Sequence, residues 1–174
     1  MLVVGAVACI ATLVGSGYAS ESSVTRCQIV NLRLSIGPGP TEATGQNTVS
    51  VVLTNRLSRS CTLKGYPAIA LLDGHGRKLP FSYSHHGDLM ITSKKPAEVR
   101  VPSGGSALFA FNKYRCDIRE LAVARTVRVA LPGNDVVRSV RLHDSDIDYC
   151  RQAASLTVAV SPIERHLQNT LSHS

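Results

Sequence analysis

The sequence predicts an all-β domain, a sandwich or barrel of about seven to nine short strands that carries two disulfides. Three observations lead to this expectation. Apolar and polar residues alternate in short runs, turn-forming residues separate these runs, and no long segment follows a helical period. Four cysteines, Cys27, Cys61, Cys116 and Cys150, follow an apolar N-terminal segment in two equally spaced pairs, each of the form C-x33-C.

Residues 1–19 are predicted to be a signal peptide. The run from Leu2 to Val14 is apolar, and Gly17 and Ala19 place small residues before the expected cleavage point. The run is shorter than the roughly 20 residues that span a bilayer, so we expect no membrane-spanning segment once the leader is removed. Loss of Cys9 with the leader leaves an even number of cysteines, as is usual in an oxidising compartment. Lipidation of Cys9 is the alternative.

The first half of the domain is expected to contain the following strands. Apolar residues alternate with polar ones over residues 30–36 and 49–54, which predicts two strands. A third strand over 69–71 leads into Asp73-Gly74-His75-Gly76, a turn in which the glycines allow positive φ. Residues 89–91 and 99–101 are shorter candidates.

The second half continues the pattern. Residues 107–111 alternate after the Pro102–Gly105 turn, and a strand over 127–131 runs into Pro132-Gly133-Asn134-Asp135 before a returning strand over 136–142. The last strand is expected over 156–160, and residues 118–124 are expected to form a helical turn. The domain organisation that follows is a linker over 20–26, the β-domain over 27–162 and a flexible C-terminal tail over 163–174.

The cysteine spacing predicts which cysteines pair. Four cysteines allow three pairings. If each C-x33-C unit is an antiparallel strand pair, residues equidistant from its centre face each other. The centres are Gly133, inside a turn signal, and Thr44, inside the polar stretch 41–46. We therefore predict the disulfides Cys27–Cys61 and Cys116–Cys150, each stabilising the fold by roughly 3–4 kcal/mol in the chain-entropy model.

The charge of the chain restricts the class of partner. The formal net charge is +7, but the basic residues are scattered singly or in pairs rather than in a run. Nucleic-acid binding calls for a clustered basic patch, so we expect no nucleic-acid partner. A basic surface favours attraction to anionic envelope polymers or lipid headgroups, and a merely soluble basic surface is the alternative.

Several sequence blocks carry a resemblance to a known family. They are Val51-Val52-Leu53-Thr54-Asn55, Cys61-Thr62-Leu63-Lys64-Gly65-Tyr66-Pro67, Ile69-Ala70-Leu71-Leu72-Asp73 with Gly76, and Val101-Pro102-Ser103-Gly104-Gly105-Ser106-Ala107. From about Cys27 to Pro162 the chain resembles the secreted actinobacterial domain-of-unknown-function family 4232. The resemblance implies an immunoglobulin-like antiparallel β-sandwich in exported or envelope-associated proteins, and it supplies no catalytic residues. The chain has no Trp, so the Trp that packs on the inter-sheet disulfide of immunoglobulin domains is absent.

Four residues of these blocks, Asn55, Gly65, Tyr66 and Pro67, are expected to be structural. Pro67 fixes φ where a strand begins, and Gly65 permits a bend. Tyr66 is expected to bury its ring while its hydroxyl finds a hydrogen-bond partner.

The candidate chemistry is limited. His85, His86 and Met90 could form a copper or zinc site, although adjacent histidines on a strand point to opposite faces, and a polar surface loop is the alternative. Residues 143–148 resemble the start of a calcium loop, but Tyr149 and Ser155 stand where an EF-hand requires Gly and Glu. The chain contains no nucleophile elbow, P-loop, zinc-protease motif or dinucleotide fingerprint. We therefore expect no catalytic residues and no cofactor.

These observations lead to a hypothesis of function. The chain is expected to be an exported, non-enzymatic binding or interaction module of the cell envelope or extracellular space. Its partner would be an envelope or extracellular protein or polymer, bound through the loops 37–46 and 85–97. The alternatives are a metal-handling protein that uses His85, His86 and Met90, a structural envelope component, and a hydrolase with an unrecognised site.

Overall fold

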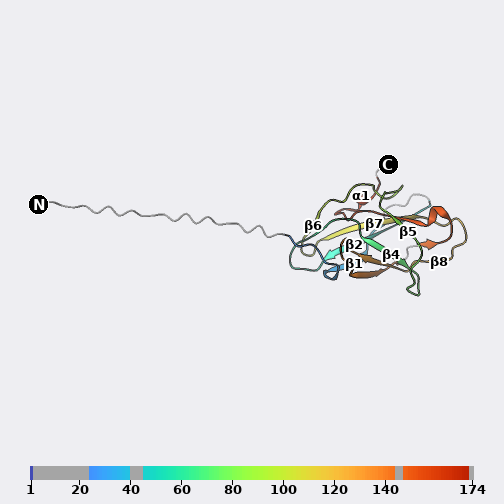
Figure 1. Cartoon of the computed structure of the whole chain (residues 1–174), viewed down its shortest axis with the longest axis horizontal. Coiled ribbons are helices and arrows are strands. Elements are labelled where there is room, and N and C mark those ends of the chain that lie inside the picture. Colours follow the sequence, from blue (N-terminus) through green and yellow to red (C-terminus); the bar gives the residue numbers. More distant parts are fainter. Residues whose placement is uncertain (2–23, 40–44, 144–146, 173–174) are drawn as a thin grey trace.

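A computed structural model describes Met1 and residues 24–39, 45–143 and 147–172 of the chain (Figure 1). The predicted signal peptide apart from Met1, and with it Cys9, lies outside the described residues, as does most of the predicted linker. The strands are β1 (Leu32–Ile36), β2 (Gln46–Asn55), β3 (Cys61–Leu63), β4 (Ala68–Leu72), β5 (Ser82–Ser84), β6 (Val99–Val101), β7 (Ser106–Tyr114), β8 (Ala122–Val123), β9 (Thr126–Ala130), β10 (Val137–Arg141), β11 (Asp148–Tyr149) and β12 (Thr157–Val160). The helical elements are the 3-10 turns η1 (Ile29–Asn31) and η2 (Ala153–Ser155) and the helix α1 (Leu167–Thr170).

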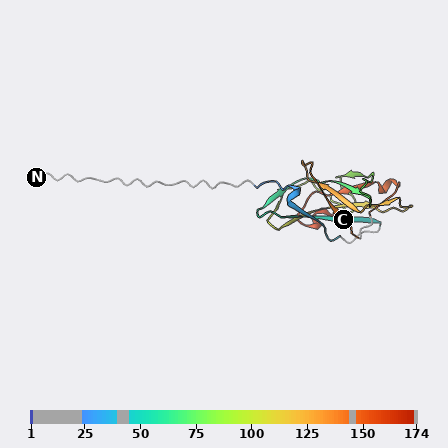
Figure 2. The ribbon, with the colours of Figure 1, turned by 90° about the horizontal axis from the view of Figure 1, so that it is seen from below.

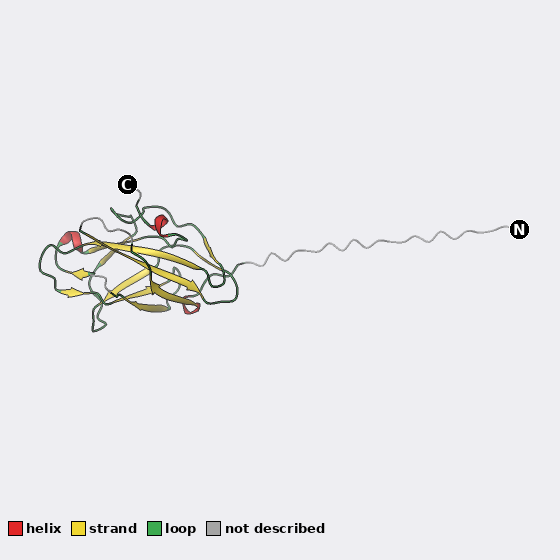
Figure 3. Cartoon of the chain, turned by 180° about the vertical axis from the view of Figure 1, so that it is seen from behind, coloured by secondary structure: helices red, strands yellow, loops and turns green. Residues whose placement is uncertain are grey.

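The strands form two main sheets and two small ribbons. The larger sheet has five strands in the order β1-β2-β7-β12-β5, and the smaller has three in the order β10-β9-β4. The ribbons pair β3 with β6 and β8 with β11, and Figure 1 shows β6 and β8 at opposite ends of the domain. All pairs between strands are antiparallel except β12 with β5. The strands lie within a flattened body (Figure 2) and the long ones run along its length (Figure 3).

One apolar core joins the two main sheets. Phe109 and Phe111 of β7 are fully buried, as are Val127 and Val129 of β9, and all four belong to the same cluster. These residues alternate along their strands, because successive side chains of a strand point to opposite faces. The alternation that predicted the strands therefore marks the face that each sheet turns toward the core.

Eight of the predicted strands correspond to observed ones. They are β1, β2, β4, β6, β7, β9, β10 and β12. Residues 89–91 form no strand, and only Ile91 makes an isolated bridge, with Leu171. The helical turn predicted over 118–124 is wrong. Ala122–Val123 is the strand β8, because its backbone pairs with that of β11. The chain is thus mostly β, with more strands than the sequence predicted, and β2 and β7 are longer than the predicted segments 49–54 and 107–111.

The described part of the C-terminal segment also differs from the flexible tail predicted for residues 163–174. Ile163 is fully buried, and Glu164 exchanges backbone hydrogen bonds of 2.8 Å with Leu108. Farther on, Thr170 is fully buried and the Ser172 N–H donates to the Met90 carbonyl over 2.9 Å. Burial of a few side chains and pairing of the backbone fix residues 163–172 against the larger sheet and the 85–97 loop.

Both predicted disulfides are present. Cys27–Cys61 and Cys116–Cys150 have Cα–Cα separations of 5.0 and 6.1 Å. The hairpins beside them are centred as the spacing predicted: β1 and β2 pair about a point between residues 43 and 44, and β9 and β10 about a point between residues 133 and 134. Within the part of the chain that the structure describes, no helix is long and apolar enough to cross a membrane.

Candidate functional site

Asn55, the first residue of the predicted structural motif, ties three segments together. Its Nδ2 donates to the carbonyl oxygens of Arg59, Val101 and Pro102 over 2.8, 3.1 and 3.1 Å. Its Oδ1 accepts the N–H of Leu57 over 2.9 Å. Because Asn55 is only 1% exposed, these contacts replace water at every polar atom of the side chain.

The Gly65-Tyr66-Pro67 block lies beside the 85–97 loop. Gly65 has φ of 116°, a value that favours glycine, and Pro67 is buried just before β4. The half-buried Tyr66 donates its hydroxyl to the Lys94 carbonyl over 3.1 Å. Its ring stacks on His85, with centroids 4.3 Å apart. Tyr66 thus contacts the loop through both its hydroxyl and its half-buried ring.

The proposed metal ligands occupy this same loop. Burial against the loop and the neighbouring His86 lower the pKa of His85. The N–H of His86 donates to Ser84 Oγ over 3.2 Å, and the N–H of Met90 donates to Asp88 Oδ1 over 2.8 Å. Among the residues that the structure describes, no three His, Cys, Asp or Glu side chains group as metal ligands. Copper or zinc binding by His85, His86 and Met90 stays a prediction.

The candidate calcium loop is only partly described, since residues 144–146 lie outside the described residues. Its last acidic residue, Asp148, lies in β11 and forms an ion pair with Lys113.

The two loops predicted to bind a partner meet at one buried side chain, Asn112 of β7. Asn112 donates through Nδ2 to Gln46 Oε1 and to Asp88 Oδ2, each over 2.7 Å. Its Oδ1 accepts the hydroxyl of Thr48 over 2.8 Å. Gln46 ends the first predicted loop and Asp88 lies within the second, so Asn112 is bonded to both loops on the outer face of the larger sheet. Asn112 is fully buried.

A cavity of about 220 Å³ opens beside this junction. Its lining combines hydrogen-bonding side chains, one aromatic ring and small apolar residues: Gln46, Ser84, Gly87, Asp88, Leu89, Tyr114, Ala154, Thr157 and Ala159. Asp88 is rigidly placed, because its Oδ1 accepts the N–H groups of Met90 and Ile91 over 2.8 and 2.7 Å. Leu89 at the cavity is 63% exposed, which is unusual for a large apolar side chain. We name this cavity and its lining residues the loop-junction cavity.

A wider hollow of about 520 Å³ lies at the other sheet, beside the Asp73–Gly76 turn. Arg125, Arg141 and His143 contribute to its lining. The carboxylate of Asp73, also in the lining, bonds to Arg77 Nε over 2.8 Å. The hollow therefore presents basic side chains on a surface that the sequence showed only as scattered charges.

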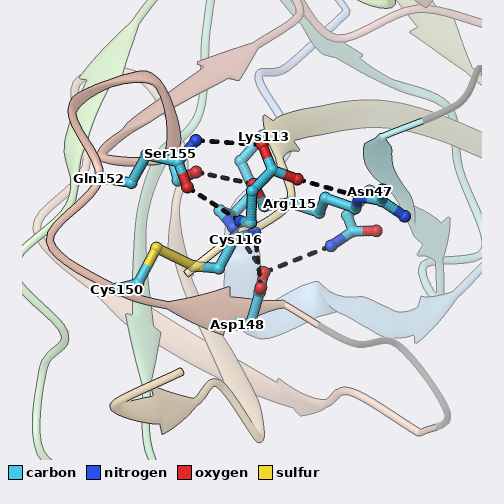
Figure 4. A network of polar contacts seen from close by, with 9 residues as sticks. Asn47, Lys113, Arg115, Cys116, Asp148, Cys150, Gln152 and Ser155 are labelled. Atoms are coloured by element: carbon cyan, nitrogen blue, oxygen red, sulfur yellow. Dashed lines mark hydrogen bonds and ion pairs between the residues drawn. A yellow bond between two sulfur atoms is a disulfide. The ribbon is translucent and has the colours of Figure 1, made fainter. Parts of the chain in front are cut away.

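The most deeply buried ionic contact of the described residues lies at the end of β7 (Figure 4). Lys113 Nζ lies 2.5 Å from Asp148 Oδ1, and the two side chains are 0% and 12% exposed. Asp148 Oδ2 accepts the N–H of Cys116 over 2.7 Å, and Oδ1 also accepts Asn47 Nδ2 over 3.4 Å. Loss of water lowers the pKa of Lys113, and the carboxylates of Asp148 and Glu120 oppose that shift.

Sequence reasoning missed Asn112 and Lys113, and it considered Asp148 only as part of the candidate calcium loop. One signal for the first two was available: Asn112-Lys113 follows the apolar run 107–111 without a turn signal, so the strand continues with two polar residues. Their pairing partners are 24 to 66 residues away in the chain. No spacing pattern in the sequence links these particular residues to their partners.

Comparison with known proteins yields a family but no activity. Neither the curated proteins nor the solved structures contain a match to this chain. A family model matches residues 27–164, which span both disulfides, both main sheets and the residues of the loop-junction cavity. The chain belongs to the family described as a domain of unknown function, DUF4232.

Proposed function

We propose that this protein is an exported, non-enzymatic binding module of the cell envelope or extracellular space, and that it binds its partner at the loop-junction cavity. The observation that carries the proposal is the meeting of two loops on Asn112 beside a cavity of about 220 Å³. Loops held on a rigid sheet are the common location of binding sites. Asn112 supplies that rigidity, because it is buried and hydrogen-bonded to a residue of each loop.

The strand order supports an immunoglobulin-like sandwich as the scaffold. Constant-type immunoglobulin domains order their strands A-B-E-D in one sheet and C-F-G in the other. If β1, β2 and β7 are A, B and E, and β4, β9 and β10 are C, F and G, the two observed sheet orders agree with that scheme. The C-terminal strand β12 then takes the place of D, and β5 joins it in parallel. The end loops of such a sandwich are its usual recognition surface.

Two features support export. Disulfides persist in oxidising compartments, and this domain has two. The apolar leader that precedes the domain is the second feature.

The chemistry of the surfaces suggests the partner. The loop-junction cavity offers an aromatic ring, hydroxyl and amide groups and the exposed Leu89, which suits an envelope or extracellular protein or polymer. The net charge of +7 and the basic hollow at Arg125 and Arg141 favour an anionic partner.

The test is capture from an envelope extract by the oxidised protein without residues 1–19. It compares the unaltered protein with Leu89→Asp, which places a charge at the loop-junction cavity, and with Val137→Asp. Val137 is the matched control, because it is also an exposed apolar residue, at 47%, but lies on β10 of the other sheet. We expect one partner to be retained at high salt, lost with Leu89→Asp and kept with Val137→Asp. Equal capture by all three proteins would refute binding at this cavity.

Metal handling is the second candidate, and one observation favours it. The lowered pKa of His85 keeps its imidazole neutral to lower pH, and the neutral ring is the form that binds a metal. Titration of the purified protein with copper and zinc ions tests it. Stoichiometric binding lost in His85→Gln would support the candidate, and absence of binding would dispose of it.

A further inference from the structure

Lys113 and Asp148 place an amine and a carboxyl group in contact where water has almost no access. Lys113 Nζ lies 2.5 Å from Asp148 Oδ1, and the lysine side chain has no exposed surface. Keeping two charges in such a place is costly, since the loss of hydration of each ion offsets much of their attraction. A neutral product of the same two groups would remove that penalty.

We propose that Lys113 and Asp148 condense after folding to form an intramolecular amide between Lys113 Nζ and Asp148 Cγ. The proposal is independent of the binding function proposed above. It assigns a covalent cross-link between β7 and β11, 35 residues apart in the chain.

The reaction balances within the pair. One proton first passes from Lys113 Nζ to Asp148 Oδ1, and the neutral amine then attacks Cγ of Asp148, so that an N–C bond forms and the bond from Cγ to Oδ1 breaks. The ammonium carries three hydrogens: one stays on the amide nitrogen, and two leave with Oδ1 as water. No oxidant, reductant or other reactant is needed. Oδ1 is the natural leaving oxygen, because it is the one in contact with the protons of Nζ.

The surroundings of Asp148 stabilise the charge that develops during such an attack. The N–H of Cys116 donates to Oδ2 over 2.7 Å, which marks Oδ2 as the oxygen that becomes the amide carbonyl. Preorganised donors of this kind lower the barrier of acyl-transfer reactions by stabilising the tetrahedral intermediate. Asn47 Nδ2 lies 3.4 Å from Oδ1 and adds a second donor.

Two further observations favour the reaction. The burial that lowers the pKa of Lys113 also raises the fraction of neutral amine, which is the nucleophile. The Cys116–Cys150 disulfide joins the chain just beyond Lys113 and just beyond Asp148, and so holds the two groups together. Fixed proximity of this kind is equivalent to an effective concentration of about 10⁵–10⁸ M in well-oriented reactions.

The decisive measurement is the intact mass of the purified protein after the disulfides have been reduced and the thiols alkylated. We expect the measured mass to be lower, by one water molecule, than the mass calculated from the sequence with its thiols alkylated. Digestion should then yield a branched peptide that contains both Lys113 and Asp148 and that survives reduction. The variant Lys113→Arg keeps the positive charge but lacks the amine, and it should have the full mass of its sequence.

Two results would overturn the proposal. One is a wild-type protein of full sequence mass after prolonged incubation in the folded, oxidised state. The other is a protein that has lost one water but releases Lys113 and Asp148 on separate peptides, because the water would then have left elsewhere, for example from a succinimide. Both readouts use the unaltered protein, so the proposal is tested even if Lys113→Arg fails to fold.

Discussion

The substitution Asn55→Asp tests how far one buried side chain holds the N-terminal half of the fold together. The two residues have nearly the same shape, so the change replaces only the amide nitrogen by an oxygen. That nitrogen donates to three backbone carbonyls, of Arg59, Val101 and Pro102, from a side chain that is 1% exposed. The oxygen that accepts the Leu57 N–H is kept.

The size of the effect follows from what the new oxygen meets. It loses the donated hydrogen bonds, and a buried acceptor left without a donor costs about 1–3 kcal/mol. The new charge also faces carbonyl oxygens without a compensating cation, and an uncompensated buried charge costs about 3–5 kcal/mol. We therefore expect Asn55→Asp to lower the free energy of unfolding by about 3–5 kcal/mol, a large part of a typical total of about 5–15 kcal/mol. Acidification should restore part of the loss, because protonation removes the charge and supplies a donor.

Urea denaturation with both disulfides intact measures this change through the transition midpoint. Asn134→Asp is the matched control. Asn134 Oδ1 accepts the Val136 N–H over 2.8 Å in an exposed turn, a role that a carboxylate also fills. We expect the control to stay within about 0.5 kcal/mol of the unaltered protein. Equal midpoints for Asn55→Asp and Asn134→Asp would refute the assignment of Asn55 as a buried three-way donor.

Four further predictions concern Tyr83 of β5, Gly65 of the motif and His85 of the 85–97 loop. Tyr83→Phe removes the acceptor of the Leu71 N–H, 3.0 Å away, and should cost about 1–3 kcal/mol in urea denaturation; an unchanged midpoint would contradict it. Burial raises the pKa of Tyr83, so its contribution is complete below the unfolded pKa and should be lost as the pH rises through the folded pKa, which alkaline denaturation measures. Gly65 has φ of 116°, and the Cβ of Gly65→Ala would lie 2.8 Å from a carbon of Pro132, whereas Gly133 has φ of 72° and open space around an added Cβ. Gly65→Ala should therefore unfold at a clearly lower urea concentration than Gly133→Ala. Equal midpoints would show that the contact with Pro132 is relieved at no cost. The pKa of His85 is lowered by burial and by the neighbouring His86, so an NMR titration should show His85 protonating below the usual range of histidine. The stabilising contribution of the neutral ring should be lost as the pH falls through the folded pKa. Titration of His85 at the usual value would contradict its stacked position on Tyr66.

The sequence was most informative where the local alternation of apolar residues and the long-range spacing of the cysteines indicated the same strands. The C-x33-C spacing placed the hairpin centres at Thr44 and Gly133, and the observed registers of β1–β2 and β9–β10 are centred within one residue of these positions. Alternating apolar residues marked the core faces of the long strands, since burial of one face imposes a period of two. Both disulfides followed from the same reasoning and are present.

The sequence was least informative where a segment gains its structure from partners far away. The strands β3, β5, β8 and β11 have two or three residues each, too few for alternation to be visible. The C-terminal segment is polar apart from isolated residues such as Ile163, yet that residue is fully buried and the backbone beside it pairs with β7. Burial of single residues decides whether such segments pack against the domain, and the sequence shows only the average polarity of the segments.

The same limit applies to the site, where the strand β7 carries two different features on adjacent residues. Asn112 points to the outer face of the larger sheet and holds both loops, while Lys113 points toward the interior and contacts Asp148. Because successive residues of a strand face opposite ways, the two features share a backbone but no side-chain contact that the structure records. A change at Asn112 should therefore affect the loop-junction cavity and leave the amine and carboxyl groups in contact. A change at Lys113 should affect the cross-link and leave the hydrogen bonds of Asn112 in place. Binding at the cavity and condensation in the interior are thus separate properties of one strand, and either can fail without the other.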